Sequence, residues 1–170
     1  MTDEEHFEAF VRAHAGPLNR TALLLTGSAY AAEDLLQETF VNLFGNWNRV
    51  RSADEPIAYV RRAMTNRFLS TRRSRSARDL SVWDVPDRPA GEDPGDRIAA
   101  RSAVFQLLGT IPDRQRTAIV LRNFNDLTDE QIAAALDCRV ATVRSLISRG
   151  MAAMRAVSQR DLAATGTEDH

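Results

Sequence analysis

The sequence predicts an all-α protein built from two small helical domains that are joined by a flexible acidic linker rich in proline and glycine. Apolar residues recur at helical spacing on both sides of residues 79–96, and we find no convincing alternating strand pattern. The segment 79–96 itself combines three prolines, two glycines and six acidic residues, a composition typical of a tether. The apolar fraction of 44% is sufficient for globular helical cores.

Three helices are expected in the N-terminal domain, which we place at residues 1–78. Each is defined by one apolar stripe, and the three stripes are Phe7, Phe10, His14, Leu18 and Leu25, then Leu36, Phe40, Leu43, Phe44 and Trp47, then Ile57, Val60, Met64 and Phe68. The linker follows at residues 79–97. Fully extended, the 18 residues 79–96 span at most about 60 Å, enough to let the two modules sit more than one DNA turn apart. Trp83 is unusual in a linker, and it either docks on a partner or packs against a domain.

The C-terminal domain, at residues 98–157, is expected to be a four-helix module that ends in a helix-turn-helix. Its third helix opens at Thr128, whose hydroxyl can accept from the amide three residues on while Gln131 reaches back, as in a capping box. Asp137 falls at the turn and tolerates a left-handed backbone. The last helix is expected to bury Val143, Leu146, Ile147, Met151 and Met154. The polar residues 158–170 are expected to form a disordered tail.

The polar face of the last helix carries the strongest functional signal. It follows Arg139 at the cap position, and it presents Thr142, Arg144, Ser145, Ser148 and Arg149. Base edges in the major groove are read by hydroxyl and bidentate donors, and phosphates attract positive charge. Solvated helix faces usually mix charge signs, whereas this one has no acid. The pattern therefore indicates sequence-specific DNA binding.

Charge is strongly segregated along the chain, although the net charge is only −1. Residues 57–78 contain seven arginines and no acid, so the third helix is expected to lie against phosphates. Tyr59, Thr65 and Asn66 stand among these arginines and could stack on or hydrogen-bond to unpaired bases, although Tyr59 could equally belong to the core. The second helix carries an acidic band, either solvated surface or a face that a basic protein accepts, made of Glu33, Asp34, Gln37, Glu38 and Asn42.

The sequence does not favour an enzyme. The three histidines are scattered, and no glycine-rich phosphate loop or metal-ligand spacing occurs, so we expect no cofactor, no metal and no small-molecule substrate. The single cysteine, Cys138, rules out an intramolecular disulfide and suits a reducing cytoplasm. No stretch approaches the roughly 20 apolar residues of a membrane span. The acidic start MTDEEHFEAF lacks the basic and apolar regions of a secretion signal.

Three segments in a fixed order carry a family resemblance. They are AAEDLLQETFVNLF, AYVRRAMTNRFLSTRR and, after the acidic linker, IPDRQRTAIVLRNFNDLTDEQIAAALDCRVATVRSLISRGMAAMR. Together they resemble the extracytoplasmic-function (ECF) sigma factors of bacterial RNA polymerase, especially the small actinobacterial kind, over roughly residues 5–157. The resemblance implies a factor without catalytic chemistry that binds core RNA polymerase and gives it promoter specificity. Promoter DNA is then the second partner, and an anti-sigma factor is a further candidate partner.

The resemblance also implies roles for particular residues. Docking on the clamp helices of the largest polymerase subunit would use Asp34, Gln37 and Glu38. Recognition and melting of the −10 element would use Asn48, Arg49, Arg51, Tyr59, Arg61, Arg62, Asn66, Arg72 and Arg73. Recognition of the −35 element would use Arg139, Thr142, Arg144, Ser145, Ser148 and Arg149. The sequence departs from the family pattern where Asp137 replaces the usual turn glycine, Arg139 a small cap residue, and Tyr59 a frequent tryptophan.

The main alternative is a stand-alone helix-turn-helix regulator that binds operator DNA without acting as a polymerase subunit. Its N-terminal domain would sense a signal or dimerise. The acidic band and the basic third helix argue against this alternative, because neither is needed for binding a duplex operator. Association with core polymerase distinguishes the two hypotheses.

Overall fold

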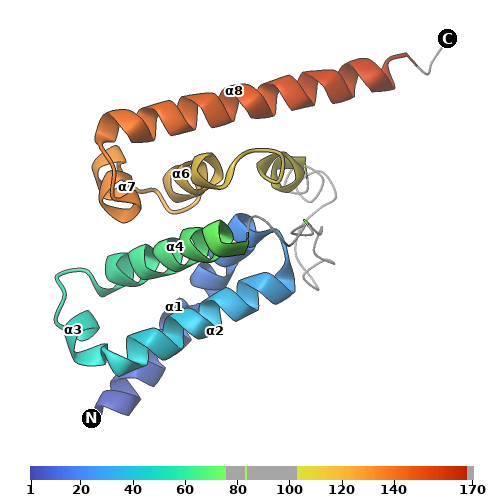
Figure 1. The fold of residues 1–170 in the computed structure, drawn as a ribbon. Coiled ribbons are helices and arrows are strands. Elements are labelled where there is room, and N and C mark those ends of the chain that lie inside the picture. Colours follow the sequence, from blue (N-terminus) through green and yellow to red (C-terminus); the bar gives the residue numbers. More distant parts are fainter. Residues whose placement is uncertain (76–82, 84–102, 168–170) are drawn as a thin grey trace.

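The computed structural model describes residues 1–75, Trp83 and residues 103–167, and the predicted all-α class is confirmed for these residues (Figure 1). The N-terminal module consists of α1 (Asp3–Thr26), α2 (Ala29–Gly45), α3 (Trp47–Arg51) and α4 (Pro56–Arg75). The C-terminal module consists of a helical segment at residues 103–108 followed by α6 (Asp113–Asn123), α7 (Asp129–Leu136) and α8 (Val140–Thr165). The predicted linker lies outside the described residues apart from Trp83. None of the helices described is both long and apolar enough to span a bilayer.

The second predicted helix is divided in the structure. α2 ends at Gly45, and the amide of Asn46 donates to the carbonyls of Leu43 and Phe44 before α3 starts at Trp47. Trp47, which follows the break, is buried, whereas Phe44, in the last turn of α2, is 53% exposed. The expectation that Phe44 belongs to the core is therefore wrong.

The helix-turn-helix forms as the sequence predicts. The amide of Gln131 donates to the Thr128 hydroxyl over 3.2 Å, and the Thr128 amide donates to the Gln131 side-chain oxygen over 2.9 Å, which completes the capping box. Asp137 ends α7 in the left-handed region, with φ 51° and ψ 54°. Arg139 stands at the N-cap of α8 and makes no side-chain capping bond.

The core-facing side of α8 differs from the predicted stripe at one position. Val143 and Met154 are buried, but Met151 is 38% exposed and Gly150 is buried in its place. A Cβ atom added to Gly150 would lie 2.6 Å from Cδ1 of Ile119, so the glycine allows α8 to approach α6 closely.

The C-terminal end of α8 corrects a second expectation. Residues 158–165 continue the helix, so the prediction of a disordered tail from residue 158 is wrong for this stretch. The stretch contains no glycine or proline before Gly166, and residues such as Leu162 and Ala163 favour helix. Because Leu162 is 71% exposed, helix propensity rather than burial accounts for this extension.

The two modules pack against each other. α1 contacts α6, and α4 contacts both α6 and α7, so that α6 and α7 lie between α8 and the N-terminal module (Figure 1). The buried apolar side chains of both modules form one cluster. Polar contacts also cross the junction, including a 3.0 Å hydrogen bond from the Thr21 hydroxyl to the side-chain oxygen of Asn125. The linker length would let the two modules sit more than one DNA turn apart, and this structure is a closed form in which they pack together.

Candidate nucleic-acid interface

The predicted −35 residues lie along one open side of α8. Five of them are exposed and Ser145 is half-buried; the exposed residues are Arg139, Thr142, Arg144, Ser148 and Arg149. The opposite side of the same turns buries Val143 completely, and α8 packs there against α6 and α7. We name these six residues the reading face. Its arginines and hydroxyls are the donors that major-groove edges and phosphates accept.

One arginine of the reading face is held by an acid from the preceding helix. Nε of Arg144 lies 3.2 Å from Oδ2 of Asp129, and the Arg144 side chain remains 66% exposed. Asp129 also pairs with Arg122 of α6 at 3.1 Å. Sequence reasoning missed this bridge, because it joins three helices that are separate in the chain. The bridge orients Arg144 at the surface without burying it.

The predicted −10 residues of α4 fall into exposed and partly buried sets. Tyr59, Arg62 and Asn66 share one face of the helix, because positions three and seven residues apart align. Arg62 and Asn66 are exposed, whereas Tyr59 is half-buried and packs against the core. Thr65 is fully buried, so its expected role in hydrogen bonding to bases is wrong.

Several basic residues predicted to meet DNA have protein partners in the closed form. Arg72 pairs with Asp113 of α6 through its Nε at 3.2 Å. Arg51 pairs with Asp3 at 2.9 Å and also contacts His6. Arg61 is half-buried, with a buried Nε that has no hydrogen-bond partner among the described residues, and Arg73 is exposed. In this form Arg72, at the end of α4, is therefore paired across the junction between the two modules.

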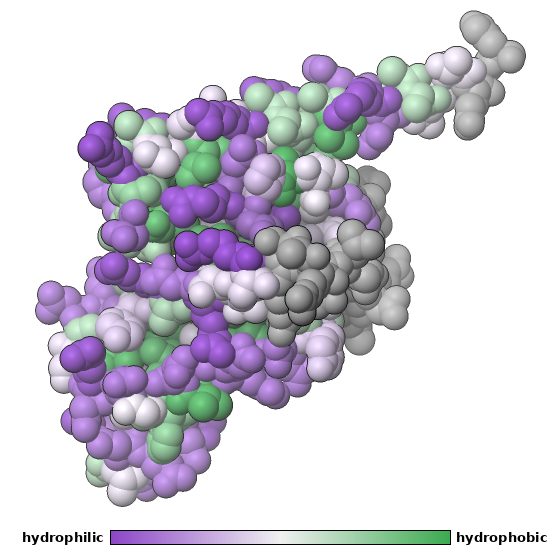
Figure 2. All heavy atoms as spheres, viewed as in Figure 1, coloured by the Kyte–Doolittle hydropathy of each residue, from purple (hydrophilic) through white to green (hydrophobic). Residues whose placement is uncertain are grey.

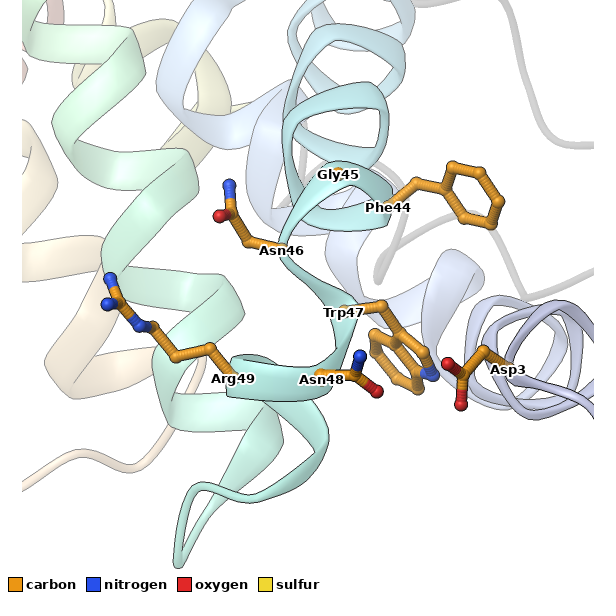
Figure 3. A pocket seen from close by; sticks show the side chains of 7 residues that line it. All are labelled: Asp3, Phe44, Gly45, Asn46, Trp47, Asn48 and Arg49. Atoms are coloured by element: carbon orange, nitrogen blue, oxygen red, sulfur yellow. The ribbon is translucent and has the colours of Figure 1, made fainter.

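A shallow pocket of about 420 Å³ lies around the start of α3. Figure 3 shows its lining side chains: Phe44 and Trp47 lie on the same side as Asp3, while Asn46 and Arg49 point to the other side. Asn48 and Arg49, both predicted to contact the melted strand, are among the residues that line this pocket. Both residues are exposed, and the carboxylate of Asp3, on the other side of the pocket, is paired with Arg51.

The predicted polymerase-binding residues lie on the outer side of α2. Gln37 is exposed and Asp34 is half-buried, while Glu38 accepts a 2.9 Å ion pair from Arg67 of α4. The same helix exposes three large apolar side chains that sequence reasoning did not assign to a surface, namely Tyr30, Val41 and Phe44. Figure 2 shows a mainly hydrophilic surface interrupted by small apolar patches. α2 therefore offers exposed aromatic and apolar groups beside its carboxylates, and aromatic residues are enriched in protein-binding surfaces with a polar rim.

Arg116 of α6 is a central residue that sequence reasoning missed. It is 3% exposed, and it donates to three carbonyls: Leu108 at 2.8 Å, Ile111 at 3.0 Å and, across the junction, Leu25 at 2.7 Å. It also pairs with Asp113 at 3.1 Å. Burial lowers the pKa of the Arg116 guanidinium, the Asp113 carboxylate raises it, and the nearby Arg72 lowers it. No periodic signal in the sequence separates this arginine from its solvated neighbours.

Comparison with known proteins identifies the family. The Sigma-70 region 2 family matches residues 10–78, and the Sigma-70, region 4 family matches residues 101–154. The RNA polymerase sigma-E factor of Streptomyces avermitilis is 31% identical over 163 residues, which cover 95% of this chain and 90% of that protein. The ECF RNA polymerase sigma factor SigE of Mycolicibacterium smegmatis is 32% identical over 88% of this chain and 60% of its own length. The chain belongs to the ECF RNA polymerase sigma factors.

A solved structure shares the fold of this sigma factor. The crystal structure of the sigma factor RpoE in complex with the anti-sigma factor NepR from Bartonella quintana matches with a TM-score of 0.75. The match has 22% sequence identity and covers 91% of this chain and 98% of that one. The sigma factor family comprises non-enzymatic transcription initiation factors, and no finding favours the stand-alone regulator.

Proposed function

We propose that this ECF sigma factor uses three separate surfaces to bind core polymerase, the −10 element and the −35 element. The acidic band of α2, with Asp34, Gln37 and Glu38, docks on the clamp helices of the largest subunit of core RNA polymerase. α4 and the segment from Asn48 hold the melted −10 strand, and the reading face of α8 recognises the −35 element in the major groove. Flipping a base costs a few kcal/mol, which pocket contacts and stacking can recover.

The exposure of the reading face is the observation that carries the proposal. Five of its six side chains are open to solvent although the helix that bears them is anchored along its opposite side. A recognition helix must combine a rigid mount with free donors, because flexible donors lose entropy on binding. The acidic band of α2 and the arginines of α4 support the assignment of polymerase docking to α2 and of −10 binding to α4. A carboxylate surface repels DNA and attracts a basic protein.

We further propose that the protein acts in the cytoplasm as a non-catalytic subunit and is controlled by an anti-sigma factor. The support for an inhibitor is the fold shared with RpoE of Bartonella quintana, which was crystallised with NepR. An inhibitor of this kind would cover the polymerase-binding or DNA-binding surfaces named above. Neither a metal nor an organic cofactor is needed for these steps.

Association with core polymerase is the experiment that tests the proposed function. The purified chain and purified core enzyme are mixed and separated by gel filtration. We expect the chain to elute with core at a one-to-one ratio and to leave that peak when a known sigma factor is added in excess. A chain that binds duplex DNA but never elutes with core would restore the alternative of a stand-alone regulator.

Arg144→Ala is expected to weaken recognition of the −35 element by about 1–3 kcal/mol, the usual value of a side chain that reads a base edge. Transcription from templates that differ only in the −35 sequence measures the change. Arg155→Ala is the matched control, because Arg155 is an exposed arginine farther along the same helix. An unchanged −35 preference in Arg144→Ala would remove this residue from the reading face.

A further inference from the structure

Trp83 packs in a defined site, which we name the indole seat, although the residue belongs to the predicted linker. Its indole Nε1 donates a 2.9 Å hydrogen bond to the carbonyl of Phe105. The indole and Phe105 rings lie 4.8 Å apart, and the guanidinium carbon of Arg116 lies 4.6 Å from the centre of the indole. A hydrogen bond, an aromatic contact and a cation–π contact thus fix one side chain.

The seat is made by both modules, and two glycines make it possible. Gly27 belongs to the turn between α1 and α2, and Gly109 belongs to the turn before α6. A Cβ atom on Gly109 would lie 2.7 Å from Cδ2 and Cγ of Trp83, and a Cβ atom on Gly27 would overlap the six-membered ring. Each side chain larger than hydrogen would displace the indole. Trp83 is therefore held between the two modules and packs directly on the backbone of each.

The other cross-module contacts surround the same place. Arg116, which lies over the indole, donates to the carbonyl of Leu25, two residues before Gly27. Asp113 accepts from both Arg116 and Arg72, and so links the indole seat to the end of α4. Removing the indole would expose Arg116 to water, and the exposure would weaken the bonds that close the junction.

The closed form cannot serve both promoter elements at once. The −10 and −35 elements are centred about 25 base pairs apart, which is roughly 85 Å along B-form DNA. α7 contacts both α4 and α8, and packed helix axes lie 8–10 Å apart, so α4 and α8 are separated by only roughly 20 Å near their crossing. The modules must therefore separate before the proposed surfaces of α4 and α8 meet their DNA targets.

We infer that Trp83 is a latch that keeps the free sigma factor closed and that its release precedes promoter binding. The part of this inference that concerns promoter binding rests on the proposed function, whereas closure by Trp83 does not. Because the free protein is mostly closed, only a minority of its molecules are in the open form that can bind. Apparent affinity for polymerase then falls in proportion to that minority. The latch would thus limit how readily the sigma factor joins core enzyme.

Three variants test the latch. Trp83→Ala removes the indole, and Gly109→Ala fills its seat at a backbone φ outside the left-handed region. Trp83→Phe keeps an aromatic ring but cannot donate to Phe105. Gly16→Ala is the matched control, because a Cβ atom there meets nothing within 4 Å. Circular dichroism checks that each variant keeps its helices.

Small-angle X-ray scattering of the free full-length protein measures closure, and binding to core polymerase measures its consequence. We expect the radius of gyration to increase in Trp83→Ala and Gly109→Ala, to increase less in Trp83→Phe, and to stay at the wild-type value in Gly16→Ala. Apparent affinity for core polymerase should rise roughly tenfold in the two open variants, as a minority competent form becomes the majority.

Unchanged scattering in both Trp83→Ala and Gly109→Ala would overturn the latch. Opened variants whose affinity for polymerase equals that of the wild type would overturn its role in assembly. If neither the wild type nor any variant binds polymerase, the proposed function fails. The scattering result still decides whether Trp83 closes the two modules, because that measurement needs no polymerase.

Discussion

Replacing Arg116 with methionine is expected to lower the free energy of unfolding by about 3–5 kcal/mol, the range found when one partner of a buried ionic network is removed. The substitution keeps an unbranched chain but removes the guanidinium that donates to the carbonyls of Leu25, Leu108 and Ile111. It also leaves Asp113 facing Arg72 alone. A buried carbonyl that loses its donor costs its full desolvation free energy, because water does not reach it to replace the hydrogen bond.

Chemical denaturation followed by circular dichroism measures the Arg116→Met effect. Arg114→Met, an exposed position two residues earlier on α6, is the matched control and should change stability by less than about 0.5 kcal/mol. A methionine variant as stable as the control would show that Arg116 does not hold the junction together.

Asp34→Arg is expected to abolish detectable binding to core polymerase while leaving the helices intact. Reversing a charge at a complementary interface replaces attraction by repulsion and costs several kcal/mol. Asp34 is half-buried on α2, and no described ion pair depends on it. Its effect on folding should therefore be small.

Binding of labelled protein to core enzyme measures the Asp34→Arg effect. Glu8→Arg makes the same charge change at an exposed position of α1 and should bind like the wild type. If Asp34→Arg binds core enzyme with wild-type affinity and the control is also unaffected, the acidic band is not the docking surface.

Local signals in the sequence predicted local structure well. The capping box of Thr128 and Gln131 and the left-handed turn at Asp137 depend on residues within one helical turn, and both form as expected. The apolar positions of α4 are buried for the same reason, since Val60 and Met64 follow one helical period.

Positions that depend on contacts between distant segments could not be predicted in this way. Gly150 replaces Met151 in the buried stripe because Ile119 approaches from another helix. Arg116 looks like a surface arginine until the carbonyl of Leu25 is placed beside it. For Trp83 the sequence left two possibilities open, docking on a partner or packing against a domain. In the structure it packs between both modules, because Gly27 and Gly109 leave room for the indole there.

The surfaces assigned to polymerase and DNA remain predictions about function. The structure places most of their residues at the surface, and it shows that the closed form pairs Arg72 with Asp113 across the junction between the modules. Arg72 loses this partner if the modules open.

Start-site-specific transcription by reconstituted holoenzyme is the most direct measurement of the central claim. The template carries a start site mapped after overexpression of this sigma factor, with variants altered at −10 or at −35 alone. We predict a discrete transcript that requires both the added chain and both elements. A transcript that core enzyme makes equally well without the chain, or no transcript from any mapped start site, would contradict the account.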